Sequence, residues 1–303
     1  MQPPPDPILP LLQGEGTHVF AVIDGARVDR LQHLLHRLQL DPKPLYLDHK
    51  GGTPHAAGPH LVPCRSDIAI LDLRISVAAD AMVWWLWPGS DATDALARIY
   101  RHLRGLGAVE IPAGYPEHRA GAAQLERVLF RHADPHVMAQ VLPVLNPAQR
   151  ARVYGKAQAI VIDDTLGAGL RIARVPADLP VPPTGFLRLT AAQMDAITDR
   201  RGQERTATLM SYMRRNAKAE TSMLTDRELE DLALRVDRRA AQLGLSESGS
   251  TLLLAFLAAV TGGAALTAPQ VERAILESDL PPDEAVTALF DAMANSSDLQ
   301  GGQ

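Results

Sequence analysis

Short apolar runs separated by turn residues dominate the first 176 residues. Residues 18–24 form an apolar run that ends at Asp24-Gly25, a turn dipeptide, and this pattern predicts a buried strand. Two further runs, at 159–162 and 170–175, are close enough to predict a hairpin. Other strands are predicted at residues 45–47, 68–75, 81–87, 108–111 and 128–131. The repeated strand pattern predicts a sheet in this part of the chain.

Helical periodicity separates these strands. Apolar residues between Val28 and Leu38 recur at helical spacing and predict an amphipathic helix. A second helix is predicted at 91–106, where Leu96, Ile99 and Leu103 fall on one face. Residues 135–145 and 147–154 predict two short helices that each begin with proline, which suits a first helical turn because its missing N–H has no partner there.

The pattern beyond the prolines of 176–183 is purely helical. Thr225 and Glu228 form a capping box, in which each side chain satisfies the other residue's backbone N–H. Residues 251–260 are apolar all round and predict a buried central helix, and 282–293 predict the last helix. Paired arginines at 200–201, 214–215 and 238–239 are typical of solvated helix faces, although methionine-containing apolar stripes here also suit partner binding.

These patterns predict an α/β (α+β) N-terminal lobe with a mixed sheet, followed by an all-helical C-terminal domain. The expected organisation has five parts. They are a flexible lead-in at 1–17, the α/β domain at 18–176, a Pro-rich linker at 177–186, the helical domain at 187–294 and a tail at 295–303.

Composition narrows the class of protein. The 46% hydrophobic and 21% charged content is that of a globular chain. The net charge is −5, and the excess of acids falls in residues 187–303, so no basic field favours nucleic acid as a partner. We see no signal sequence and no apolar run of about 20 residues that could span a bilayer. A soluble cytoplasmic protein without a membrane partner is therefore expected.

The histidines and the cysteine do not predict a metal site. All ten histidines lie between His18 and His136, but His132 and His136 straddle a predicted helix start and no His-Glu-x-x-His motif occurs. We interpret them as surface or hydrogen-bonded side chains. Cys64 is the only cysteine, which excludes a disulfide and a multi-cysteine zinc site within one chain, and a small core residue is its ordinary role although His60 lies four residues before it.

Catalytic motifs are also missing from the sequence. Asp24, Asp134, Asp163 and Asp164 could supply carboxylates for acid–base chemistry, but nothing in their spacing brings them together. Asp24 before glycine and Asp134 before proline suit a turn and a helix N-cap. We expect Arg131 and Asp134 to form a local ion pair or network. No nucleophile elbow and no phosphate-binding loop is found, so we predict no catalytic residue, no cofactor and no enzyme activity.

All three tryptophans fall within four residues, at Trp84, Trp85 and Trp87. Alternation along a strand places Trp85 and Trp87 on one face and Trp84 on the other. Core packing is one interpretation, because aromatic side chains bury large areas. An exposed partner surface is the other, because tryptophan is enriched in binding hot spots.

One stretch resembles a family signature. Residues 128–138 read Val-Leu-Phe-Arg-His-Ala-Asp-Pro-His-Val-Met, followed by Leu145-Asn146-Pro147 and Tyr154-Gly155. This block is similar to the Phe-Arg-Phe-Tyr-Asp-Pro-Arg block of bacterial type VI secretion adaptor-chaperones built on the domain of unknown function 4123. Further similar segments, in the right order, are 20–26, 44–47, 58–62 and 100–104. Where the family has two aromatics and an arginine, this chain has His132, Ala133 and His136, so any contacts made there must differ.

The resemblance implies a function that the residues alone do not. Family members are cytoplasmic adaptors that hold a secreted toxin effector and load it onto the VgrG spike, often with a PAAR-domain tip protein. The N-terminal lobe would be the shared platform, and the helical region the more cargo-specific part. The site residues implied are the contact candidates Trp84, Trp87, Phe130, Arg131 and Tyr154 and the motif residues Asp24, Asp134 and Pro135. Two alternatives stay open, a hydrolase using Asp24, Asp134 and His132, and a scaffold without cargo.

Overall fold

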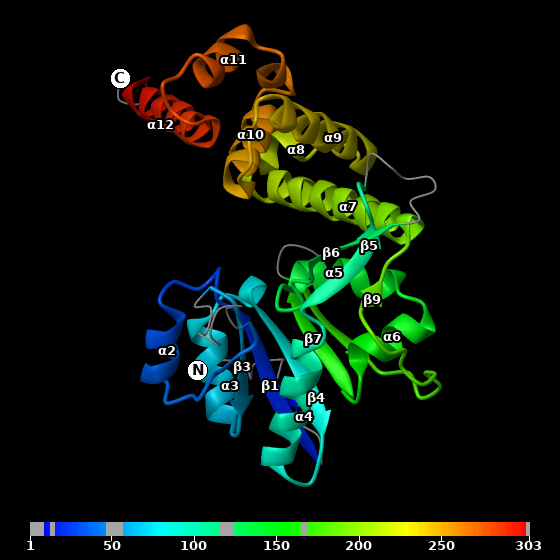
Figure 1. Ribbon diagram of the computed structural model, residues 1–303. Coiled ribbons are helices and arrows are strands. Elements are labelled where there is room, and N and C mark those ends of the chain that lie inside the picture. The colour runs from blue at the N-terminus through cyan, green and yellow to red at the C-terminus, as the bar shows by residue number, and fades with distance from the viewer. Residues whose placement is uncertain (1–8, 13–15, 47–56, 116–123, 165–168, 301–303) are drawn as a thin grey trace. The chain divides into compact units, whose positions relative to one another are not determined.

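The computed structural model describes residues 9–12, 16–46, 57–115, 124–164 and 169–300. The chain divides into two compact units, residues 1–200 and 201–303 (Figure 1). The division falls within helix α7 (Ala191–Asn216), so the residues predicted as a linker, 177–186, lie in the first unit. Parts of the predicted lead-in and of the loops near 49–60, 112–122 and 164–169 lie outside the described residues.

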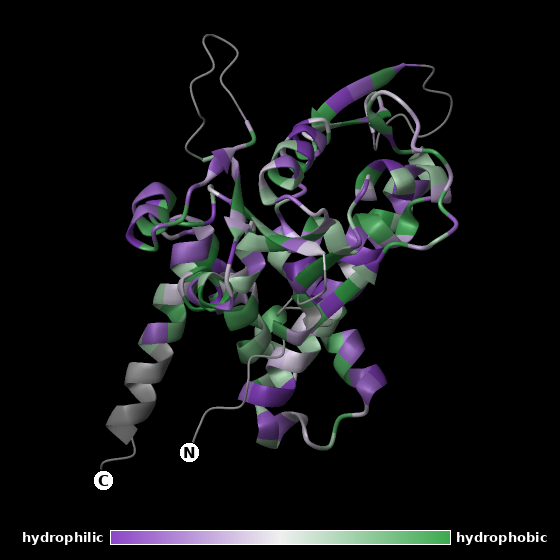
Figure 2. Cartoon of the chain, turned by 90° about the horizontal axis from the view of Figure 1, so that it is seen from below, coloured by the Kyte–Doolittle hydropathy of each residue, from purple (hydrophilic) through white to green (hydrophobic). Residues whose placement is uncertain are grey.

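A six-stranded antiparallel sheet forms the centre of the first unit, in the order β2-β3-β1-β4-β7-β8. Its strands are β1 (Thr17–Asp24), β2 (Lys43–Pro44), β3 (Pro59–Cys64), β4 (Met82–Pro88), β7 (Ala159–Asp164) and β8 (Gly169–Arg174). The predicted hairpin at 159–162 and 170–175 is confirmed as β7 and β8. The middle strands bury apolar residues, coloured green in Figure 2, in two cores on opposite faces, because helices cover both sides.

The two faces of the sheet carry separate cores. Trp85 and Trp87 pack on one face with helices α4 (Ala92–Arg104), α5 (Pro135–Val144) and α6 (Pro147–Tyr154). Trp84 packs on the other face with α2 (Leu31–Arg37) and α3 (Asp67–Ser76). The alternation predicted from the sequence is therefore confirmed, and the unit has a helix–sheet–helix layering around β1 and β4.

A second, mixed sheet adjoins the core that contains Trp85. Strand β5 (Ala108–Pro112) pairs antiparallel with β6 (Leu125–Leu129) and parallel with β9 (Leu187–Arg188). Val109, Ile111 and Leu187 are buried in that core. The predicted strand at 128–131 thus lies earlier, at 125–129, and Phe130 and Arg131 follow it.

The strand predicted at 68–75 was wrong, because these residues form helix α3. Ser66 caps the helix by accepting a hydrogen bond from the Ala69 N–H at 3.2 Å. Ile70 and Leu73, three residues apart, are buried, whereas Ile68 and Ile75 are exposed. Short apolar runs are ambiguous between strand and buried helix, and here the cap and the three-residue spacing decided the structure.

The second unit is helical, as predicted. Besides the end of α7 it contains α8 (Lys218–Thr221), α9 (Asp226–Gln242), α10 (Ser248–Val260), α11 (Pro269–Leu276) and α12 (Pro282–Gln300). The capping box at Thr225 is confirmed, with Thr225 Oγ1 accepting from the Glu228 N–H at 3.3 Å. Helix α12 continues through residues 295–300, which the sequence pattern assigned to a tail.

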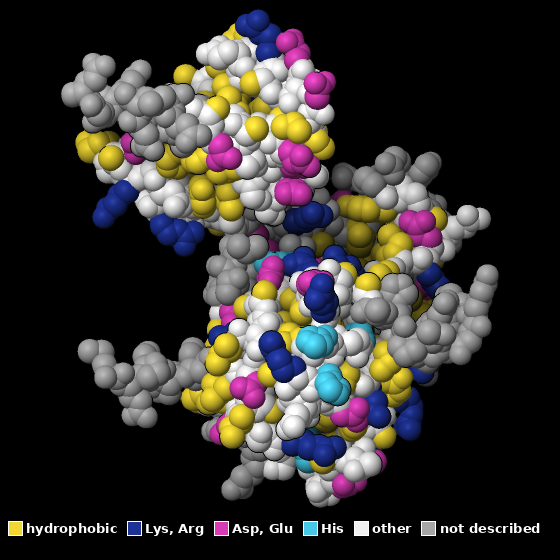
Figure 3. All heavy atoms as spheres, turned by 90° about the vertical axis from the view of Figure 1, so that its left-hand side faces the viewer, with side chains coloured by type: hydrophobic (Ala, Val, Ile, Leu, Met, Phe, Trp, Pro, Cys, Tyr) yellow, Lys and Arg dark blue, Asp and Glu magenta, His cyan; other side chains and the backbone are white. Residues whose placement is uncertain are grey.

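Three short helices complete the described secondary structure: α1 (Leu9–Leu12), η1 (Ala79–Ala81) and η2 (Ala264–Leu266). Within the described residues, none of the helices combines the length and the apolar character needed to cross a membrane. Figure 3 shows acidic, basic and histidine side chains interspersed on the surface of the first unit.

Candidate functional site

Asp24 stands at the end of β1, where the sequence predicted a turn. Its carboxylate Oδ1 accepts a hydrogen bond from the Ala26 N–H at 3.1 Å, and its main-chain oxygen accepts from the Arg27 N–H at 3.1 Å. Gly25 N–H donates to the main-chain oxygen of Gly58 at 3.2 Å. The turn dipeptide therefore holds Asp24 with its second carboxylate oxygen free for another donor.

That donor is Arg131, in the segment between β6 and α5. Its guanidinium Nη2 lies 2.5 Å from Asp24 Oδ2 and 3.5 Å from Asp134 Oδ2. The ion pair expected between Arg131 and Asp134 is confirmed, and Asp24 extends it to a residue 107 positions away in the sequence. Arg131 thereby connects the end of a central strand to the start of α5.

Asp134 serves two purposes at once. It is the N-cap of α5: Oδ1 accepts from the His136 N–H at 2.9 Å and the Val137 N–H at 3.4 Å, and Pro135 takes the first helical position. Its Oδ2 lies 3.2 Å from Arg27 Nη2 as well as near Arg131. The predicted cap is confirmed.

Arg27 completes the arrangement by reaching Asp80 in η1, where its Nη1 lies 3.1 Å from the carboxylate Oδ2. We name Asp24, Arg27, Asp80, Arg131 and Asp134 the arginine–aspartate cluster. The antiparallel register explains its assembly, because Ile23 of β1 pairs with Met82 of β4 and so places the residues just before β4 beside the end of β1. The cluster joins three chain segments where β1 ends and β4 begins, in the middle of the sheet.

Burial divides the roles within the cluster. The side chains of Asp24 and Asp134 are 8% and 3% exposed, while those of Arg27 and Arg131 are 32% and 43% exposed. The hydrogen bond from Arg131 to Asp24 raises the pKa of the guanidinium. Solvent therefore meets the cluster through its arginines and through Asp80, which is 36% exposed, while the carboxylates of Asp24 and Asp134 are covered.

Tyr46 borders the same cluster. Its hydroxyl donates to the main-chain oxygen of Phe130 at 3.2 Å. Burial and then the nearby Asp24 carboxylate raise the pKa of Tyr46 to about 12, with Arg131 acting in the opposite direction. The phenol is thus protonated at neutral pH and available as a hydrogen-bond donor to Phe130.

The positions of the Asp24 and Asp134 carboxylates do not favour a role in acid–base catalysis. Asp24 and Asp134 do converge, but on the same arginine, and both oxygens of each carboxylate accept hydrogen bonds or ion pairs from the protein itself. A general acid or base must instead reach a proton of the substrate. Asp163 pairs with Arg74 of α3, and the side chain of Asp164 lies outside the described residues. The ion pairs of the cluster therefore have a structural role, since they connect β1, η1 and the start of α5.

His33 and His36 are exposed and His60 and His102 are hydrogen-bonded, as the sequence predicted, but His132 differs. His132 has no exposed area, and burial lowers its pKa to about 4. Both of its ring nitrogens lack a hydrogen-bond partner among the described residues, and its ring lies 6.1 Å from that of Phe130. Within the described part of the chain, no three His, Cys, Asp or Glu side chains gather as a metal site would require.

The aromatic contact candidates are in the core. Trp84, Trp87, Phe130 and Tyr154 are 0%, 2%, 3% and 5% exposed. Of the five candidate contact residues, only Arg131 presents substantial side-chain surface. Their burial favours core packing, the first of the two interpretations of the tryptophans, and partner contact by them stays a prediction.

A second constellation, missed in the sequence, joins two segments of the signature. His102 of α4 lies 2.8 Å through Nε2 from the main-chain oxygen of Val153, and burial lowers its pKa to about 4. Gly155, at φ +57°, lies so close that an added Cβ would be 2.5 Å from the His102 ring. The Tyr-Gly pair that ends α6 therefore needs glycine for both its backbone conformation and its packing.

Comparison with protein-family models finds a match in the first unit. Residues 19–152 match the family described as "Domain of unknown function (DUF4123)". The match contains all five members of the arginine–aspartate cluster. Neither the comparison with curated proteins nor the comparison with solved structures finds a match.

Proposed function

We propose that this chain is a non-catalytic adaptor that binds a type VI secretion effector and assists its loading onto a VgrG or PAAR-tipped spike. The match of residues 19–152 to DUF4123 and the motif similarity to the adaptor-chaperones support the assignment. The observation that carries the non-catalytic part is the arginine–aspartate cluster, whose two buried carboxylates are satisfied within the protein.

The cluster gives such an adaptor a rigid platform. It ties β1, η1 and the start of α5 together, so the surface around them keeps its shape while a partner binds and leaves. An adaptor must release its cargo, which favours an interface of moderate size over a permanent one. Binding then relies on apolar contacts surrounded by polar groups.

We assign the cargo contact to the helical unit. Several large apolar side chains are exposed there, and exposed apolar groups of this kind suit partner contact. They are Met223, Leu234, Val260, Leu276 and Leu280. Met223 is the most exposed at 90%, and it has a counterpart in the first unit, Val181, that is equally exposed.

The test is affinity purification of the tagged full-length protein from its native cells under conditions that express the secretion system, with bound proteins identified by mass spectrometry. We expect a VgrG-like or PAAR-domain protein and a toxin-domain protein. Met223→Asp should reduce recovery of the toxin-domain protein, whereas the matched variant Val181→Asp should not.

Three outcomes contradict the proposal. Recovery of neither partner while the secretion system is expressed rejects the adaptor role. Turnover in a hydrolase screen with added divalent metals supports the alternative built on Asp24, Asp134 and His132. Self-assembly without any other protein supports a scaffold.

A further inference from the structure

Helix α4 presents a row of arginines on its exposed side. Arg98, Arg101 and Arg104 recur every three residues, and this spacing places them along one face of the helix. The opposite face buries Ile99 and Leu103 in the core. The proposed adaptor role does not account for this row, which includes the Arg-His-Leu-Arg segment of the signature.

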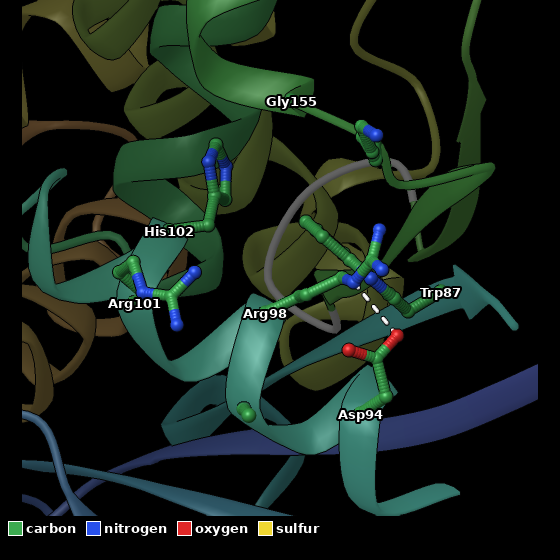
Figure 4. A pocket seen from close by; sticks show the side chains of 8 residues that line it. Trp87, Asp94, Arg98, Arg101, His102 and Gly155 are labelled. Atoms are coloured by element: carbon green, nitrogen blue, oxygen red, sulfur yellow. Dashed lines mark ion pairs between the residues drawn. The ribbon is translucent and has the colours of Figure 1, made fainter. Parts of the chain in front are cut away.

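Beside the row lies a hollow of about 480 Å³. Figure 4 shows its lining, with Arg98, Arg101 and His102 all contributed by α4. We name it the basic hollow, and it is lined by Trp87, Asp94, Ala97, Arg98, Arg101, His102, Gly155 and Lys156.

The floor of the basic hollow is rigid. His102 is fixed by the carbonyl of Val153 at 2.8 Å, and the Trp87 ring lies 5.4 Å from the His102 ring. Gly155 packs against the same imidazole with no room for a Cβ. A preformed floor favours binding, because little conformational freedom remains to be lost when a partner arrives.

The rim carries uncompensated positive charge. Arg98 forms an ion pair with Asp94 at 2.7 Å, drawn as a dashed line in Figure 4. Asp94 is the one acidic residue in the lining, and within the described ranges no acidic group pairs with Arg101 or Lys156. This local positive charge occurs in a chain whose net charge is −5.

We propose that the basic hollow binds an acidic segment of a partner polypeptide, with Arg101 and Lys156 pairing with its carboxylates. The charge of the rim selects the sign of the ligand, and the exposed Ala97 offers a small apolar area for the segment's other atoms. Nucleic acid fits less well, because it needs an extended basic field and the rest of the chain does not supply one. The proposal deepens the proposed function, since the effector or the spike protein would carry the segment.

A labelled peptide tests the charge recognition without any secretion component. The probe is a fluorescein-labelled ten-residue peptide of alternating Glu and Ala, followed by fluorescence anisotropy against the full-length protein. Arg101→Glu with Lys156→Glu should weaken binding at least tenfold. The matched control, Arg201→Glu with Lys218→Glu, reverses one exposed arginine and one exposed lysine elsewhere and should leave it unchanged. Raising NaCl from 50 to 300 mM should also weaken binding of the wild type.

Equal affinity of the wild type and the Arg101/Lys156 variant would overturn the proposal. So would tighter binding of a ten-nucleotide single strand that the same variant abolishes, or a dimer of the wild type that the variant dissolves. These results point to nucleic acid and to a second copy of the chain, respectively.

Affinity purification separates this proposal from the adaptor role. If the Arg101/Lys156 variant loses a spike or toxin-domain protein that the Arg201/Lys218 variant retains, both proposals gain support. If both variants recover the partner equally, the basic hollow is not its site although the adaptor role stands. If the wild type recovers neither protein while the peptide still binds, the adaptor role fails and the hollow remains a site for acidic segments.

Discussion

Replacing Asp134 with alanine should destabilise the first unit by about 2–3 kcal/mol. The lost N-cap contributes about 1 kcal/mol, because the N–H groups of His136 and Val137 lose their acceptor. Removing a partner from a fully buried ion pair costs about 3–5 kcal/mol. Here Arg27 and Arg131 keep 32% and 43% of their side-chain area in water, so we reduce this part to about 1–2 kcal/mol.

Two further variants separate these contributions. Asp134→Asn keeps an oxygen acceptor for the helix N-terminus and loses only the charge. It should therefore lower the free energy of unfolding by the ion-pair part alone, about 1–2 kcal/mol. Asp80→Ala removes a partner of the same Arg27, but this carboxylate is 36% exposed, and its loss should cost under about 1 kcal/mol. The expected order of stability is wild type, Asp80→Ala, Asp134→Asn, Asp134→Ala.

Tryptophan fluorescence during urea unfolding measures the first unit alone. All three tryptophans lie on β4, within residues 1–200, and the helical unit has none. In thermal unfolding of a unit of this size, the loss of stability expected for Asp134→Ala corresponds to a decrease in Tm of about 4–12 °C. A transition of Asp134→Ala that coincides with the wild type would refute the structural role of the cluster. Equal losses for Asp134→Asn and Asp134→Ala would refute the cap contribution.

Three other variants test other features. Gly155→Ala should destabilise the first unit by about 2–4 kcal/mol, because its Cβ meets the His102 ring at 2.5 Å, whereas Gly16→Ala, with positive φ but open space, should cost about 1 kcal/mol in the same fluorescence assay. His132→Phe should stabilise that unit or leave it unchanged, because two unpartnered buried nitrogens are removed while the larger ring must fit. The folded-state pKa of His132, about 4, lies below its ordinary 6.5, so the wild type loses stability as pH falls from 6.5 to 4. The advantage of His132→Phe should therefore grow over this range, and a constant difference would contradict the assignment. Thr225→Ala should cost the helical unit about 1 kcal/mol by circular dichroism while the tryptophan transition stays in place.

Local signals in the sequence predicted local structure well. The alternation of Trp84, Trp85 and Trp87 followed from the geometry of a strand, and the capping box at Thr225 from its spacing. Asp134 before proline identified a helix start, and Arg131 three residues earlier was close enough to suggest the ion pair. In each case the interacting residues are only a few positions apart in the sequence, so local backbone geometry alone brings their side chains close together or separates them.

The rest depended on contacts between distant segments. Arg131 meets Asp24 across 107 residues. Arg27 meets Asp80 across 53, because β1 and β4 pair in one register. No periodicity within a single segment contains that information. The strand wrongly predicted at 68–75 illustrates a different limit, since its isoleucines favour a strand by propensity while the Ser66 cap and the spacing of Ile70 and Leu73 favour the helix that forms.

Helix α7 has a practical consequence for dividing the protein. A cut after Pro183, the boundary that the prolines suggest, would remove Leu187 and Arg188 and leave β5 without its parallel neighbour. A cut at the border of the compact units would instead sever a 26-residue helix in its first half. The first cut would therefore remove a strand from its sheet, and the second would divide a continuous helix. Expression of separate halves is therefore a poor way to map binding, and point substitutions in the intact chain are the better tool.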